Sequence, residues 1–140
     1  MVLPDTSTEF GARVARRLAT EDVIWLTTVN PNGGPVSIPI WFFWDGDNVL
    51  MYSQPNKPKL RNVARNPKVE LHFNSDQYGN DVIRIAGSAW IDDGAPPASD
   101  IAEMMTKYAR GLESINTTPE GFAGEYSVAL RVRPTKINGY

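Results

Sequence analysis

The chain has 140 residues, 41% of them hydrophobic, which is enough apolar material for a single globular domain over residues 1–140. Fourteen basic and sixteen acidic residues give a net charge of −2, so there is no basic excess to favour nucleic-acid binding. The absence of cysteine excludes disulfides, thiolate metal sites and cysteine nucleophiles. No apolar run has the length of a membrane span or a signal peptide, so we expect a soluble cytoplasmic protein that has no membrane partner.

The first part of the chain predicts a helix, a strand and a turn. Thr6–Glu9 has the form of a capping box, and apolar residues then recur every fourth position from residue 10 to residue 18. This pattern predicts a helix that ends near Ala19. The β-branched and aromatic run Val23–Val29 predicts a strand, and Asn30–Gly34 predicts the turn that follows it.

Two apolar runs in the centre of the chain, Val36–Trp44 and Val49–Ser53, predict a β-hairpin. The residues between them, Asp45–Asn48, favour a tight reversal because glycine and asparagine tolerate positive φ. Successive side chains of a strand alternate, so the rings of Trp41–Trp44 lie on both of its faces. One face can fill a core, and the other needs a second partner. Such a stripe is typical of a core or a subunit interface, and also of a wall against which a ligand ring stacks.

The polar connection Gln54–Asn62 leads from this hairpin into a short predicted helix that Pro67 stops. Free backbone N–H groups, the positive end of the helix dipole and lysine side chains together favour an anion. The same residues also fit a solvated helix start. The polar side chains gathered here are Ser53, Lys57, Lys59, Arg61 and Asn62.

The remainder of the chain alternates strands with less regular segments. Lys68–Phe73 and Val82–Ile91 predict two strands, and Tyr126–Val132 predicts the last one. Ser99 is placed to cap a helix with apolar residues at helical spacing, whereas Gly111–Gly124 has no periodicity and predicts a mobile loop. Six or more antiparallel strands with two or three outer helices indicate a mainly β fold, a barrel with helices packed outside it.

The sequence contains no recognisable catalytic constellation of its own. It has no glycine-rich phosphate loop and no nucleophile elbow, and its acidic residues are scattered over turns. His72 is the only histidine, and one imidazole does not make a transition-metal site, so we predict neither a metal nor a catalytic side chain. A protein of this kind can still be an enzyme when a cofactor carries the reactive atoms.

Several short motifs give the chain a likeness to a known family. They are Tyr52-Ser53, Lys57, Lys59, Arg61-Asn62, Arg65–Val69 and Arg131–Lys136. With these motifs the chain resembles the pyridoxamine 5′-phosphate oxidase-like split β-barrel family, and more closely its actinobacterial branch that uses the deazaflavin coenzyme F420. The resemblance implies a split barrel of the FMN-binding type and a homodimer with cofactor sites at the subunit interface. Lys59 matches a position that is basic in both branches, whereas Pro58 stands where the family has an arginine, and this departure favours F420 over FMN.

The resemblance implies an F420-dependent oxidoreductase that transfers a hydride between reduced deazaflavin and an electron-poor organic acceptor. The phosphate would lie at Ser53, Lys57, Lys59 and Asn62, and Arg131 and Arg133 would reach the cofactor tail. The ring would lie against Ile38, Pro39, Ile40 and Trp41, where Pro39 interrupts the ladder and leaves backbone groups free. Two alternatives remain: a protein that carries F420 without turnover, and an FMN-dependent enzyme of the pyridoxamine-phosphate-oxidase type.

Overall fold

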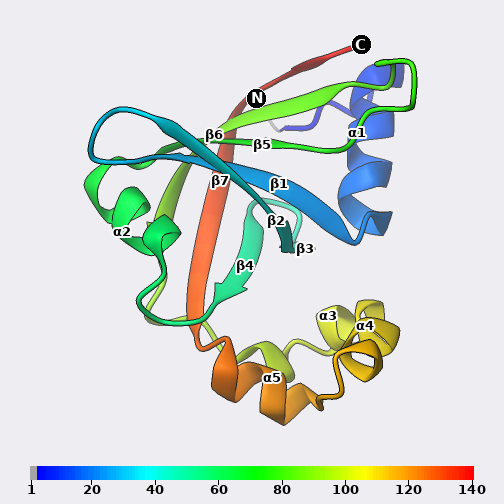
Figure 1. Cartoon of the computed structure of the whole chain (residues 1–140). Helices are drawn as coiled ribbons and strands as arrows, with labels where there is room; N and C mark the ends of the chain where they lie inside the picture. The colour runs from blue at the N-terminus through cyan, green and yellow to red at the C-terminus, as the bar shows by residue number, and fades with distance from the viewer. Residues whose placement is uncertain (1–2) are drawn as a thin grey trace.

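The computed structural model describes residues 3–140. One sheet of seven antiparallel strands runs in the order β2-β1-β5-β6-β7-β4-β3 and curls into a split barrel (Figure 1). The predicted mainly β fold is therefore confirmed. The strands are β1 Val23–Val29, β2 Pro35–Trp41, β3 Phe43–Trp44, β4 Val49–Ser53, β5 Lys68–His72, β6 Ile83–Ile91 and β7 Val128–Gly139.

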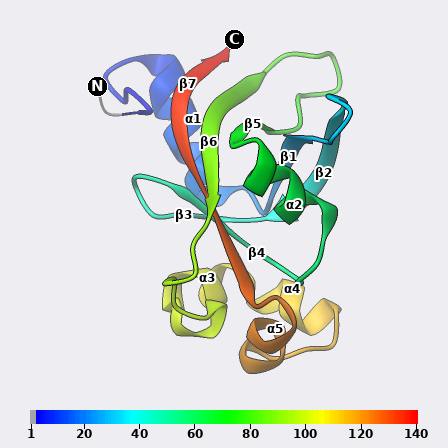
Figure 2. The same cartoon turned by 90° about the vertical axis from the view of Figure 1, so that its left-hand side faces the viewer.

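Within residues 3–140 five α-helices accompany the sheet, and α3, α4 and α5 gather at one end of the barrel (Figures 1 and 2). The expectation of two or three helices is wrong, and so is the mobile loop at Gly111–Gly124. Thr118 starts a helix there, because its hydroxyl accepts the Gly121 N–H at 3.0 Å and Pro119 suits the first helical position. The helices are α1 Glu9–Thr20, α2 Pro58–Arg65, α3 Ala102–Lys107, α4 Ala109–Ser114 and α5 Pro119–Glu125, with a 3-10 turn at Ala98–Asp100.

Helix α1 packs its apolar face on the barrel and pairs its basic face with a distant loop. Its N-cap is Thr8 and not Thr6, because the Thr8 hydroxyl accepts the Gly11 N–H at 2.9 Å. Arg13 and Arg17 both form ion pairs with Asp81, which lies just before β6. Within residues 3–140, no helix combines the length and the apolar character that crossing a membrane requires.

The predicted central hairpin forms only in part. The Asp45–Asn48 reversal is confirmed, since the Asp45 N–H donates to the Asn48 carbonyl at 3.1 Å and Gly46 has a φ of +99°. The run Val36–Trp44, however, is interrupted at Phe42. Its first part, β2, pairs with β1, and only the two residues of β3 pair with β4. The two edge strands of the sheet are therefore joined through a single residue.

The structure has two hydrophobic clusters, one inside the barrel and one between β4 and helices α3–α5. All five residues of β4 are buried, because alternate side chains face the two clusters. The aromatic run alternates in the same way: Phe42 and Trp44 pack with the barrel core, and Trp41 and Phe43 pack with the second cluster. The partner predicted for the second face is thus supplied by α3–α5 of the same chain.

The corner at Phe42 is held by side chains from the end of α3. The Tyr108 hydroxyl accepts the Phe42 N–H at 2.9 Å and lies 2.7 Å from the Asp22 carbonyl, to which it donates. The half-buried Lys107 ammonium donates to the Phe42 carbonyl at 3.0 Å and lies 3.8 Å from the centre of the Phe42 ring. Burial lowers the pKa of Lys107 to about 8 and raises the pKa of Tyr108 well above its ordinary value.

These pKa shifts predict how stability changes in mildly alkaline solution. Between about pH 8 and the ordinary lysine pKa of 10.5, the unfolded chain binds more protons at Lys107 than the folded chain does. The free energy of unfolding should therefore rise with pH in this window. Above about pH 10 the raised pKa of Tyr108 acts in the opposite sense, because the unfolded tyrosine loses its proton first.

Urea unfolding of the unmodified protein and of Lys107→Met, at intervals from pH 8 to pH 10, measures this effect. We expect the unmodified protein to gain stability relative to the variant as the pH rises. All other titrating groups are common to the two proteins, so they cancel in the comparison. Parallel stability curves would show that Lys107 titrates alike in the folded and unfolded states.

Candidate functional site

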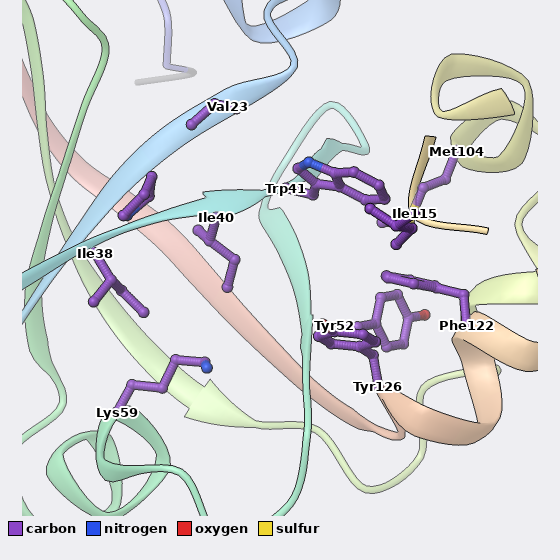
Figure 3. Close-up of a pocket in the computed structure, with 11 residues that line it drawn as sticks. Val23, Ile38, Ile40, Trp41, Tyr52, Lys59, Met104, Ile115, Phe122 and Tyr126 are labelled. Atoms are coloured by element: carbon purple, nitrogen blue, oxygen red, sulfur yellow. The ribbon is translucent and has the colours of Figure 1, made fainter. Parts of the chain in front are cut away.

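A cleft of about 380 Å³ lies where β2 parts from β4, with α2 at one end and the α4–α5 region at the other (Figure 3). We call this space the split cleft. It exists because β2 is an edge strand: one of its sides pairs with β1, and its other side pairs with no strand of the sheet. Its lining residues are Val23, Ile38, Pro39, Ile40, Trp41, Tyr52, Lys59, Met104, Ile115, Phe122 and Tyr126.

One end of the split cleft is aromatic. The Trp41 indole stacks on the Tyr108 ring at 4.6 Å between centroids and faces the Phe122 ring at 5.7 Å. Phe122 in turn stacks on Tyr126 at 4.6 Å. Figure 3 shows Trp41, Phe122, Tyr126 and Tyr52 gathered at this end. Stacked rings of this kind offer a flat, apolar surface to a ligand with a flat ring.

The other end of the split cleft is cationic. Lys59 extends from α2 toward β2, and its ammonium is the only charged group among the lining residues (Figure 3). Burial, and secondly the charge of nearby Lys57, lower the pKa of Lys59. Within residues 3–140 no carboxylate lies within ion-pair distance of it. An anion bound here would relieve both effects, because it would compensate the buried charge.

The start of α2 adds to the positive potential. Lys57 is the N-cap and provides no side-chain hydrogen bond to the helix, and the first turn contains no acidic residue. The positive end of the helix dipole is therefore compensated by neither a capping oxygen nor a carboxylate. The helix start and two lysines act in the same direction at this end of the split cleft.

The structure brings together five of the residues that the sequence predicts for a cofactor site. Ile38, Pro39, Ile40 and Trp41 line the wall formed by β2, and Lys59 lies across from them. Lys57 is exposed and lies next to this group without lining the split cleft. A ring surface and a cation thus occur in one cleft.

Ser53 and Asn62 are almost completely buried, and other parts of the protein engage their polar atoms. The Ser53 hydroxyl donates to the Gln54 carbonyl at 2.7 Å. The Asn62 side-chain amide donates to the Thr28 hydroxyl at 3.0 Å, and its oxygen accepts from Arg65 at 2.9 Å. Asn62 therefore holds α2 against β1, and a contact of either residue with a ligand stays a prediction.

The two arginines of β7 lie outside the split cleft. Arg131 donates to the Asp92 carboxylate at 2.7 Å and to the Asp45 carboxylate at 3.1 Å, which links β7 to two turns. This contact is also what chiefly holds the pKa of Asp92 below its ordinary value. Arg133 is exposed, opposite Ser88 of β6. A contact of either arginine with the tail of a cofactor stays a prediction.

Sequence reasoning missed the residues that form the aromatic end. Phe122 and Ile115 lie in the segment Gly111–Gly124, which the sequence predicts as a mobile loop. Tyr126, just after α5, lies in the predicted last strand, and Met104 of α3 lies in the helix predicted after Ser99, so neither residue was assigned to a site. A signal was present: Thr118-Pro119-Glu120 is a good helix start, and Phe122 and Tyr126 are four residues apart.

The arrangement can bind a flat ring that carries an anionic group. Residues 3–140 contain no cluster of three or more histidine, cysteine or acidic side chains placed to hold a metal ion. Fold and cleft together define a split barrel with a largely apolar cleft that contains one lysine. The chain belongs to the pyridoxamine 5′-phosphate oxidase family, whose profile matches residues 10–139.

Solved structures with the same fold differ in what their names say they do. An F420 reductase superposes with a TM-score of 0.63 at 22% identity, covering 88% of this chain and 94% of its own. The heme storage protein HutZ from Vibrio cholerae superposes with a TM-score of 0.65 at 14% identity, covering 94% and 95%. A conserved hypothetical protein from Mycobacterium tuberculosis gives 0.71 at 18% identity, covering 93% and 82%. These identities establish the fold alone. No curated protein matches the chain.

The buried contacts of Asn62 predict that its loss reduces stability. Asn62→Ala leaves the Thr28 hydroxyl buried without its partner, which costs about 1–3 kcal/mol in the free energy of unfolding. Urea unfolding measures this cost, and Asn80→Ala, at an exposed position, is the control and should change stability by less than about 0.5 kcal/mol. Equal stability of the two variants would contradict a bracing role for Asn62.

Proposed function

We propose that the protein is an F420-dependent oxidoreductase that transfers a hydride between reduced deazaflavin and an electron-poor organic acceptor. The observation that carries this proposal is the split cleft itself, which has a half-buried lysine without a carboxylate at one end and stacked rings at the other. Coenzyme F420 combines a flat ring with an anionic tail, so it fits both ends. When bound, its ring supplies the hydride.

The residues of the chain would bind and orient the cofactor. Lys59, with Lys57 and the start of α2, would hold the phosphate, and Ile38–Trp41 would form a wall for the ring. Met104, Ile115 and Phe122 would exclude water from the reacting face. Alignment and close approach are what hydride transfer requires, so the lack of a histidine or cysteine in the split cleft is no obstacle.

Three observations bear on the choice of cofactor. Pro58, at the first position of α2, stands where the family has an arginine, and this departure favours F420 over FMN. One structural neighbour is named an F420 reductase. Another is named a heme storage protein, so hemin belongs in any binding comparison. An F420 carrier without turnover remains the alternative to an enzyme.

Titration of the purified protein with F420, FMN and hemin separates the cofactors. We expect F420 to bind most tightly, followed by oxidation of reduced F420 when a quinone or nitroarene acceptor is added. Binding without oxidation of reduced F420 by any acceptor supports the carrier. Tighter binding of FMN or hemin than of F420 would overturn the proposal.

Lys59 provides the sharpest test of how the cofactor is held. Lys59→Ala removes a charge-assisted hydrogen bond worth about 1.5–3 kcal/mol, so the F420 dissociation constant should rise roughly ten- to a hundredfold. F420 fluorescence measures this affinity. Lys68→Ala, at an exposed position of β5, is the control and should keep the affinity of the unmodified protein. If Lys59→Ala and Lys68→Ala bind F420 equally, the start of α2 is not the phosphate site.

We further propose that the protein is a cytoplasmic homodimer. The rings of Trp41–Trp44 give no reason to expect the subunit interface there, because α3–α5 of the same chain cover their second face. The outer face of β1 offers another surface. Trp25 points away from the barrel core and stacks on His72, with centroids 6.0 Å apart and planes parallel within 1°. A partly exposed stacked pair on an open sheet face favours association with a second copy.

Sedimentation at micromolar concentration is expected to show a dimer. Trp25→Arg should shift the protein toward monomer, because it places a charge in the middle of the proposed interface. Trp90→Arg, on the partly exposed Trp90 of β6, is the matched control and should leave the dimer intact. A folded monomer for the unmodified protein would refute the dimer.

A further inference from the structure

The Trp41 indole separates the split cleft from a second hollow behind it. This back hollow has a volume of about 400 Å³ and contains Gly111 of α4, which does not line the split cleft. Trp41 lines both spaces. A displacement of the indole away from the back hollow would therefore carry it into the ring end of the split cleft. The back hollow is lined by Asp22, Trp41, Thr106, Lys107, Tyr108, Ala109, Arg110 and Gly111.

Gly111 lies against the edge of that indole. A Cβ atom at position 111 would lie 2.9 Å from Cη2 and 3.0 Å from Cζ2 of Trp41, well inside ordinary van der Waals contact. Two further rings pack on the indole and restrict its movement, Tyr108 at 4.6 Å and Phe122 at 5.7 Å between ring centroids. A side chain at position 111 must therefore displace either the indole or α4.

The backbone gives no reason for glycine at this position. Gly111 is absent from the residues with positive φ, so an alanine could adopt the same backbone conformation. Alanine would also favour the helix, since glycine is among the poorest helix formers. The close approach of the indole is what distinguishes this position from an ordinary helical one.

We propose that Gly111 is a specificity-determining residue, which sets the depth of the ring end of the split cleft through the position of the Trp41 indole. The inference rests on the proposed function in that it takes the split cleft as the ligand site. Gly111 touches no ligand and acts through Trp41. Larger ring systems need the full depth that the missing side chain provides, and smaller ones do not.

Two probes with the same anionic group and different ring sizes test this proposal. They are 8-anilinonaphthalene-1-sulfonate (ANS), followed by its own fluorescence, and 1-naphthalenesulfonate, followed by displacement of ANS. Gly111→Ala should weaken ANS binding by about tenfold and 1-naphthalenesulfonate binding by clearly less. Gly124→Ala on α5 is the matched control, because a Cβ there meets nothing within 4 Å, and it should leave both affinities unchanged.

Substitution of Trp41 distinguishes the proposed contact from a general effect on folding. Phenylalanine lacks the Cη2 and Cζ2 atoms that face Gly111, so in a Trp41→Phe background Gly111→Ala should change ANS affinity by less than about twofold. If Gly111→Ala alone does not fold, a folded double variant supports the contact and an unfolded one overturns it.

Equal weakening of both probes, an unchanged affinity for ANS, or no binding of ANS by the unmodified protein would overturn the proposal. The proposed function fails separately. If the unmodified protein binds ANS with the expected response to Gly111→Ala but does not bind F420, the role of Gly111 stands and the cofactor assignment is lost.

Discussion

The hydroxyl of Tyr108 holds the one point at which the two edges of the sheet meet. At Phe42 the chain leaves β2 and begins β3, so the Phe42 backbone is in neither ladder although its side chain is completely buried. Unpaired backbone groups at such a place are costly. Tyr108 accepts the Phe42 N–H, and Lys107 donates to the Phe42 carbonyl. The barrel can remain split because these two side chains replace the hydrogen bonds that the corner lacks.

The same contacts fix the helices that form the aromatic end of the split cleft. Tyr108 follows α3 directly, and its ring stacks on Trp41 while its hydroxyl binds the corner. Helices α4 and α5 continue from there and place Phe122 against Trp41. The contacts at Phe42 therefore allow the gap between β2 and β4. This gap is the split cleft, in which β2 lies beside the aromatic rings and Lys59.

Patterns local in the sequence predicted the strands and the cationic end. The β-branched and aromatic residues of Val23–Val29 predict β1 with its observed bounds. Lys59 lies, as predicted, at the start of the short helix that follows a strand. The run Val36–Trp44 was predicted as one strand, because the interruption at Phe42 depends on Tyr108, 66 residues further along. The alternation of the rings of Trp41–Trp44 between two faces was predicted correctly. The residues that cover the second face, however, belong to helices of the same chain and not to a second subunit.

The remaining differences come from partners that are remote in the sequence. Asn62 and Arg131 are polar residues in the expected segments, yet Thr28, Asp45 and Asp92 engage them, and no local pattern reveals these pairings. Glycine and proline at residues 111–124 suggested a loop. The N-cap at Thr118 and packing of Phe122 in the second cluster outweigh the low helix propensity of these residues.

A crystal structure of the protein grown with coenzyme F420 tests the central claim most directly. The account predicts the ring in the split cleft, against β2 and beside Trp41, with a phosphate oxygen about 3 Å from the Lys59 ammonium. Binding of the cofactor at the outer face around Trp25 and His72, or in the split cleft with its phosphate far from Lys59, would contradict it.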